Sequence, residues 1–421
     1  MNMERSRSKV CGIDIHKRFL VATILERNGP KKTEKFQNTL EQLLKLKEWI
    51  ITEQCEAVAF ESTGEYWVSL YDVLQGYVEI IVANSYHIKW IPGKKTDTID
   101  SEWIAELALN DLISPSRILS KEKRDIRALT RLREKLVNER TDHKNRVHKV
   151  LDSACIRLSG YFTDLFGKSG LRILKCILSG VPPEEVVRKL PKRLHTKSDA
   201  ILNAVRTQLS AHQLIQLQTS VTMIDLLTDK IKDLEHTILN ELRKDRRKLQ
   251  ILMSVPGIGT IGATTLLAEI GDVNDFSSPD KLTKWVGITP RVYQSADKLH
   301  TGSITKQGSK HIRWILVEIA HSCIRTRNTA LRIFFDRIFN RSGYKKAIVA
   351  LARKILKLVW HLLTNDELYQ EKNTLLTKSS RLPNPHETKS FSVSTAIELL
   401  VKAGFQIIEG DDHPTKRDLG T

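Results

Sequence analysis

The first 115 residues alternate between short apolar runs and segments whose apolar residues recur at helical spacing. The runs "KVCGIDI" and "FLVATILE" are rich in β-branched residues and predict two strands, with "HKR" between them as a hairpin turn. A third short strand is expected at about 35–38. These three segments predict an antiparallel start to a sheet.

Helical spacing follows in "TLEQLLKLKEWI", where Leu40, Leu43, Leu44, Leu46 and Trp49 share one face. The next expected elements are a strand "AVAFEST" that contains Glu61, a helix at 66–75, a strand at 78–82 and a helix after Asp97. Three strands followed by helix, strand, helix, strand and helix is the element order of an RNase H-like sheet. We therefore predict an α/β domain at 1–115.

Two long helices are predicted in the middle of the chain. Residues 117–150 carry twelve Lys and Arg against five Asp and Glu, with interleaved leucines and neither Pro nor Gly. At 215–248, Ile224, Leu227, Ile231, Leu234 and Ile238 alternate by three and four, which is a heptad seam. Glycine and proline break the pattern between them, so a small helical insertion is expected at about 160–210. An antiparallel coiled coil, a dimerisation arm and an ordinary helical bundle all fit this pattern.

Charge and cysteine usage narrow the class of protein. The 421 residues carry 67 Lys and Arg against 49 Asp and Glu, a formal net charge of +18, and the usual polyanionic partner of such a chain is nucleic acid. Five scattered cysteines without a C-x-x-C pair argue against a disulfide framework or a zinc site. No apolar run approaches the length of a membrane span, and the start lacks a secretory h-region. A cytoplasmic protein with no membrane partner is expected.

Four carboxylates are candidates for a metal site. Asp14 lies in an apolar strand, Glu61 ends another, and Asp97 and Asp100 stand one helical turn apart at the start of a helix. Together on one sheet edge they would suit Mg²⁺, which prefers oxygen ligands and keeps waters for a phosphate. Each also has an ordinary interpretation, as a helix cap, a first-turn acid or a surface residue.

Two segments further along could contact DNA. "PGIGTIGATTLLAEIG" places Gly257 and Gly259 before a helix, as in a helix-hairpin-helix motif whose free N–H groups bind phosphate, or as in a plain tight turn. The segment "RVYQSADKLHTGSITKQGSKHIR" is polar and basic. Its hydroxyls are conceivable nucleophiles and its cations could neutralise phosphate, but spacing alone does not choose among them. They are Ser295, Ser303, Thr305 and Ser309, with Lys306, Lys310 and Arg313.

In order along the chain, several motifs resemble the insertion-sequence-110 family of DEDD-type transposases, which includes the pilin-gene invertases. They are "GIDIHK", "FESTGEYW", "KTDTIDSEWIAELA", "PGIGTIGATTLLAEIG" and "GITPRVYQS…GSITKQGSKHIRWIL". The resemblance covers nearly everything from Lys9 to about His361.

This resemblance implies a four-part chain. A RuvC-like DEDD catalytic domain at 1–115 would precede a coiled-coil linker at 116–248. A mainly helical C-terminal transposase domain with the serine motif would occupy 249–364, and a tail or small appendage 365–421.

The resemblance also implies chemistry and partners. Asp14, Glu61, Asp97 and Asp100 would hold Mg²⁺, with Mn²⁺ as a substitute, and Ser295 would form a phosphoserine link with DNA. A structured guide RNA and a dimer or tetramer are implied as partners. Gln294 and Ala296 depart from the family's serine motif, and Ser101 replaces an alanine.

Three functions follow as hypotheses. The first is a transposase that recombines donor and target DNA through a covalent serine. The second is a RuvC-like metal-dependent nuclease or junction resolvase that uses water. The third is a non-enzymatic basic scaffold for nucleic acid.

Overall fold

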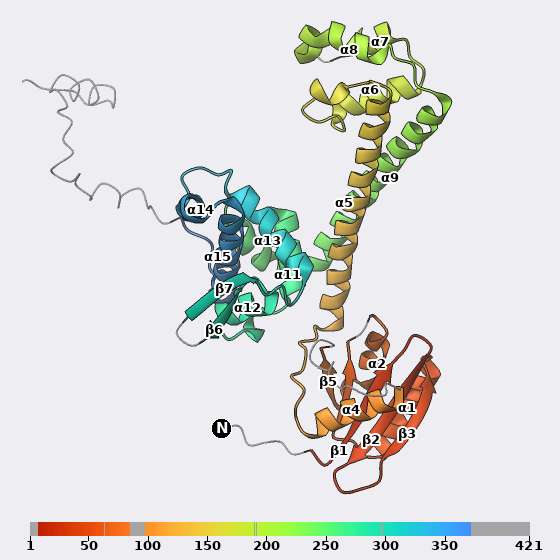
Figure 1. Cartoon of the computed structure of the whole chain (residues 1–421), viewed down its shortest axis with the longest axis vertical. Helices are drawn as coiled ribbons and strands as arrows, with labels where there is room; N and C mark the ends of the chain where they lie inside the picture. Colours follow the sequence, from red (N-terminus) through yellow and green to blue (C-terminus); the bar gives the residue numbers. More distant parts are fainter. Residues whose placement is uncertain are drawn as a thin grey trace, which may run out of the picture. The chain divides into compact units, whose positions relative to one another are not determined.

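The computed structural model describes residues 7–62, 64–84, 97–188, 190, 192–295 and 298–371, with the backbone alone at 193, 293–295 and 298–301. By internal contacts the chain divides into two compact units, with the break between residues 126 and 127. Each unit is described by itself below (Figure 1).

The first unit is built on a five-stranded sheet in the order β3-β2-β1-β4-β5. Its strands are β1 (Lys9–Ile15), β2 (Phe19–Glu26), β3 (Lys32–Gln37), β4 (Ala57–Glu61) and β5 (Glu79–Ala83). The first three pair antiparallel, whereas β1–β4 and β4–β5 pair parallel. The predicted element order is confirmed, and the predicted third strand is longer and begins three residues earlier than expected.

Helices cover both faces of this sheet. One face packs against α1 (Leu40–Thr52) and α2 (Trp67–Leu74), which bury Leu43, Leu46 and Leu70 with Ile13 and Phe60 of the strands. The other face packs against α4 (Asp97–Leu109), in a smaller core formed with Val10, Ala57 and Ala59. Because strand side chains alternate between faces, even-numbered residues of β1 face α4.

The second unit contains the two long helices. They are α5 (Lys121–Ser153), whose first residues belong to the first unit, and α9 (Ala211–Glu241). Arg133 pairs with Glu235 at 2.7 Å, and Arg140 Nη1 donates to Thr228 Oγ1 at 3.3 Å. Numbers rise along one helix as they fall along the other, so the pair is antiparallel (Figure 1). The seam of α9 buries Ile224, Leu227, Ile231 and Ile238.

The predicted helix at 215–248 is wrong at its end. The α-helix stops at Glu241, and a 3₁₀ turn, η3 (Leu242–Asp245), leads into α10 (Arg246–Met253). Leu242 is 2% exposed in this turn, so the chain breaks helical geometry where it buries that side chain. The insertion is helical as expected, with η1 (Leu158–Gly160), α6 (Lys168–Leu178), α7 (Pro183–Arg188), η2 (Lys192–Lys197) and α8 (Ser198–Val205).

The C-terminal part of this unit is mainly helical around one core. Its elements are α10, α11 (Thr260–Ile270), η4 (Val273–Asp275), α12 (Pro279–Val286), α13 (Lys310–Cys323), α14 (Ala330–Ser342) and α15 (Tyr344–Asn365), with a hairpin of β6 (Pro290–Ser295) and β7 (Lys298–Ile304). Of the expected tail at 365–421, residues 372–421 lie outside the described residues. All five cysteines are free. Among the described residues, no helix combines the length and apolarity that crossing a membrane requires.

Candidate active site

Asp14 lies at the carboxyl end of β1, on the face that α4 covers. The strand places it two residues after Gly12, which is the point of closest approach between strand and helix. A Cβ atom built on Gly12 would lie 2.3 Å from both the carbonyl oxygen of Ser101 and the amide nitrogen of Ala105. The backbones of β1 and α4 are therefore in direct contact, which only glycine allows here.

This contact positions the first turn of α4 beside Asp14. Asp97 and Asp100 stand in that turn; Asp97 lies one helical turn before Ser101, and Asp100 lies immediately before it. The Ser101 hydroxyl is fully buried and hydrogen-bonds Thr23 Oγ1 of the neighbouring strand at 2.7 Å, which fixes the helix laterally. A carboxylate oxygen of Asp97 lies within 4.8 Å of one of Asp14, and Asp100 is near enough to raise the pKa of Asp14.

Glu61 reaches the same edge through strand register. Ile13 pairs with Phe60 across the parallel β1–β4 ladder, and Asp14 and Glu61 follow them. Neighbouring strands lie about 4.8 Å apart, and residues in parallel register point to the same face. Glu61 is therefore on the α4 face of the sheet, next to Asp14 in the strand register.

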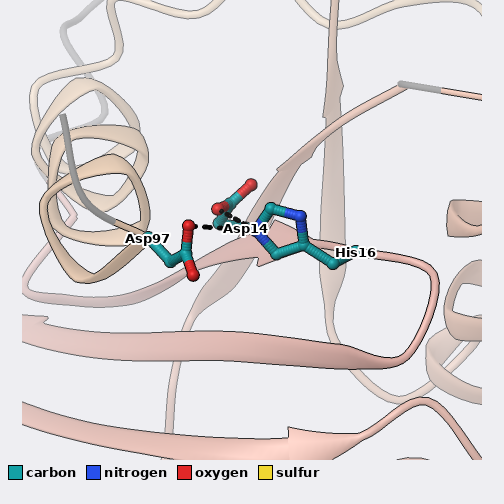
Figure 2. A group of neighbouring side chains, drawn as sticks. All are labelled: Asp14, His16 and Asp97. Atoms are coloured by element: carbon teal, nitrogen blue, oxygen red, sulfur yellow. Dashed lines mark hydrogen bonds and ion pairs between the residues drawn. The ribbon is translucent and has the colours of Figure 1, made fainter.

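His16 is a site residue that sequence reasoning missed. Its Nε2 lies 3.0 Å from Asp14 Oδ2 and 3.2 Å from Asp97 Oδ1, so the imidazole joins the strand acid to the helix acid (Figure 2). Ligand atoms of these three residues all lie within 4.8 Å of one another. The signal was present in "GIDIHK", because residues two apart at a strand end share a face.

The electrostatics of the cluster fit a divalent cation. Burial raises the pKa of Asp14 above its ordinary value; nearby His16 lowers this pKa, while Asp100 and Asp97 raise it again through repulsion. The Asp14 side chain is 20% exposed and that of Asp97 is 48% exposed, so water and a phosphate can reach them. A set of carboxylate oxygens with open positions is the donor set that suits a metal ion acting on phosphodiesters.

Ser295 is the last residue of β6, where its backbone pairs with Lys298 of β7. The segment that the sequence marks as polar and basic forms a two-stranded hairpin, β6–β7. Ser295 belongs to the second compact unit, whereas the four carboxylates belong to the first. Its side chain lies outside the described set.

The segment after β7 has a defined shape. Gly287 has a φ of +75°, and a Cβ there would lie 1.9 Å from the Gln307 carbonyl oxygen, so the segment packs directly on the end of α12. Arg313 Nη1 donates to the carbonyl oxygens of Val286, Gln307 and Gly308 at 2.9–3.0 Å. Burial lowers the pKa of Arg313. This guanidinium therefore holds the segment in place, whatever else it contacts.

The other polar residues of this segment differ in role. Ser309 is the N-cap of α13, where its hydroxyl accepts from the His311 amide, so its oxygen already has a structural partner. Lys306 and Lys310 are exposed and remain available to a phosphate. Lys306 adopts a φ of +58° at the turn.

The glycines of "PGIG" connect α10 to α11. Gly257 has a φ of +91°, and a Cβ there would lie 2.6 Å from Cys323 Sγ, so this glycine is required by packing. A Cβ at Gly259, the N-cap of α11, would meet nothing within 4 Å. The open side of Gly259 leaves the helix start accessible, as phosphate binding would need.

A buried ion-pair network, which sequence reasoning also missed, joins α5 to this domain. Glu269 of α11 is fully buried and accepts two hydrogen bonds from Arg131, at 2.7 and 3.1 Å. Burial raises the pKa of Glu269, but the ion pairs with Arg131 and Arg127 outweigh this and leave its pKa below the ordinary value. Glu134 also contacts His311 Nδ1 at 2.6 Å.

An α/β unit with acids gathered at one sheet edge, in a chain with a strong positive charge, is the arrangement expected of an enzyme that acts on nucleic acid phosphodiesters. Family models support this class. Residues 11–156 match a DEDD transposase model and residues 249–335 match the transposase IS116/IS110/IS902 family.

Similar proteins include transposases and a gene-inverting protein. The chain is 26% identical over 318 residues to a probable family 20 transposase of Pseudomonas aeruginosa, covering 74% of this chain and 85% of that protein. It is 24% identical to the transposase for insertion sequence element IS1328 of Yersinia enterocolitica, covering 86% of this chain and 98% of that protein. A pilin gene-inverting protein of Moraxella bovis is 29% identical, covering 34% and 47%.

The chain belongs to the IS110 family of transposases. It is a DNA transposase or recombinase, and its family indicates the use of a divalent metal. This assignment leaves the hypothesis of a non-enzymatic scaffold without support.

Proposed function

We propose that this transposase cuts and rejoins DNA strands through a Mg²⁺-dependent site formed by Asp14, Glu61, Asp97 and Asp100 and a covalent link to Ser295. The observation that carries the proposal is the convergence of Asp14, Asp97 and Asp100 at the edge of the five-stranded sheet, which we interpret as RuvC-like, beside the register position of Glu61. When bound, the metal would polarise the scissile phosphate and stabilise the leaving oxygen.

The covalent step exchanges one phosphoester bond for another, so it needs no outside energy source. The Ser295 hydroxyl attacks phosphorus, a P–Oγ ester forms, and the bond to one deoxyribose oxygen breaks. The proton lost by the serine is matched by the proton that the leaving hydroxyl gains. Attack by a hydroxyl of another strand then reverses the chemistry and frees the serine. Lys306, Lys310 and Arg313 would neutralise phosphates, and Gly257 and Gly259 would let DNA approach the start of α11.

The proposal is tested by trapping the adduct. Full-length protein is incubated with labelled DNA carrying the element's ends, denatured with detergent, and analysed for DNA that stays attached to protein. Ser295→Ala should abolish the adduct and leave DNA binding intact, whereas Ser303→Ala, on the other strand of the same hairpin, should retain it. An adduct that survives Ser295→Ala would disprove the assignment.

The carboxylates are tested in the same assay. Asp14→Asn should abolish the adduct in Mg²⁺ or Mn²⁺. Glu102→Gln is a matched control on α4, because Glu102 pairs with Lys31 at 2.8 Å, away from the cluster. Equal activity of Asp14→Asn and Glu102→Gln would contradict a catalytic site at Asp14.

A RuvC-like nuclease with water as the nucleophile is the second candidate. It is favoured by the same acidic cluster, and it predicts free DNA ends with no adduct in the wild type. The presence or absence of the covalent species therefore separates the two candidates.

We also propose that a dimer or tetramer combines the acids of one copy with the serine of another. Asp14→Asn and Ser295→Ala proteins, each inactive alone, should restore the adduct when mixed, with DNA attached to the Asp14→Asn subunit. No restoration in mixed oligomers of the two variants would show that both groups act within one copy.

A structured guide RNA is the remaining proposed partner, alongside donor and target DNA. The four-part organisation at 1–115, 116–248, 249–364 and 365–421, with α5 and α9 as a coiled coil, would provide the basic surfaces for both. RNA recovered with the purified protein should include a transcript from the element. Nuclease-treated protein should lose recombination until that RNA is restored, and full activity without RNA would contradict guidance.

A further inference from the structure

His16 stands among the four proposed ligands, and no motif assigns it a role. Its ring contacts acids from two different elements, β1 and α4, rather than one (Figure 2). Two functions are compatible with such a place. The imidazole could hold the carboxylates apart until a metal displaces it, or it could remain as a ligand.

The spacing of the donor atoms favours a ligand. At the metal–oxygen distance of about 2.1 Å that Mg²⁺ requires, neighbouring corners of an octahedron are about 3 Å apart. His16 Nε2 lies 3.0 Å from Asp14 Oδ2 and 3.2 Å from Asp97 Oδ1. The Nε2 atom therefore stands at such a separation from each of the two oxygens, and all three atoms lie within 4.8 Å of one another.

The imidazole and its backbone also contact groups outside the cluster. Its ring lies against Phe19, with centroids 4.7 Å apart. The backbone at His16 is bonded on both sides: its amide donates to the Phe19 carbonyl at 2.9 Å, and its carbonyl accepts from Asn38 Nδ2 at 3.1 Å. These contacts fix the backbone from which the imidazole reaches Asp14 and Asp97.

We propose that His16 is a nitrogen ligand of the catalytic metal, bound between Asp14 and Asp97. The inference rests on the proposed metal site and goes beyond its four carboxylates. An imidazole favours transition ions relative to Mg²⁺, which prefers oxygen. His16 should therefore raise the affinity of this site for Mn²⁺ more than its affinity for Mg²⁺.

The test is spectroscopy of Mn²⁺ bound to the full chain, without a catalytic readout. Pulsed electron paramagnetic resonance of the wild type should show ¹⁴N modulation from a directly bound imidazole. His16→Ala should lose that modulation and bind Mn²⁺ at least about tenfold more weakly. Mutating a residue that only supports a metal ligand already lowers metal affinity about 10- to 100-fold, so loss of a ligand should cost at least as much. The affinity of His16→Ala for Mg²⁺, measured by displacement of Mn²⁺, should change less. His236→Ala, an exposed position on α9, is the matched control and should behave as wild type.

The outcomes separate this inference from the proposed function. Wild-type protein that binds Mn²⁺ without ¹⁴N modulation would overturn the role of His16 and leave the carboxylate site intact. Protein in which Asp14→Asn leaves Mn²⁺ binding unchanged would overturn the metal site itself. The wild-type spectrum decides the first question directly, so it does not depend on the folding of a variant.

Discussion

The contact between Gly12 and α4 makes a sharp prediction about how the acids are positioned. In Gly12→Ala the new Cβ would stand 2.3 Å from two backbone atoms of α4, whereas ordinary contact begins at 3.4 Å. Backbone atoms cannot rotate away, so the helix must retreat by about 1 Å, and with it Asp97 and Asp100.

Two magnitudes follow from that displacement. Overpacking of this kind costs about 1–3 kcal/mol. Amide exchange in β1 and α4 should therefore accelerate by about 5- to 150-fold, since each 1.4 kcal/mol corresponds to tenfold. A misplacement of about 1 Å in a catalytic group can cost about 100-fold in rate. Excision of the element should fall by that order, while binding to its DNA ends persists.

The assay combines two measurements on the full chain. Excision from a donor plasmid gives the activity, and hydrogen exchange read by mass spectrometry gives the local stability of β1 and α4. Gly160→Ala is the control, because a Cβ at Gly160 would meet nothing within 4 Å. Amide exchange at the wild-type rate in Gly12→Ala would refute the close contact between Gly12 and α4. Faster exchange with undiminished excision would refute the dependence of chemistry on the position of α4.

Two further predictions concern the buried groups. Glu269 has a lowered pKa, so its ion pairs stabilise the fold above the ordinary carboxyl pKa of 4.5, and that stability is lost as the pH falls through the lower folded pKa. Glu269→Gln should therefore reduce the free energy of unfolding by about 1–3 kcal/mol at pH 7. The difference in thermal midpoint between the wild type and Glu269→Gln should disappear in acid. A difference that stays constant down to pH 3 would contradict a stabilising role for these ion pairs. Burial raises the pKa of Cys323 to about 12 and that of Cys11 well above its ordinary value, whereas Cys155 is exposed. A thiol reagent at pH 8 should label Cys155 first and reach Cys11 and Cys323 only after unfolding; equal labelling rates would show that the two cores are open.

Much of the first unit could be predicted because its signals are local. Apolar runs of five to eight residues bounded by polar turns are typical of strands. The placement of Asp97 and Asp100 on one face depends only on helical geometry. The helix at 117–150 was likewise readable from composition and the lack of Pro and Gly. The 3₁₀ turn at Leu242–Asp245 was not, because the helical pattern of the sequence runs on through it, and only the structure shows that Leu242 is buried there.

The sequence by itself determined the elements, the acidic residue types at their ends, and the strong positive charge that suits a nucleic acid partner. Tertiary structure alone decided that Gly12 would admit a helix backbone, that His16 would join Asp14 to Asp97, and that Glu269 would be buried against α5. These relations join residues far apart in the chain, or place neighbours on a face that only packing defines. Side-chain spacing along one element carries no information about which backbone will lie against it.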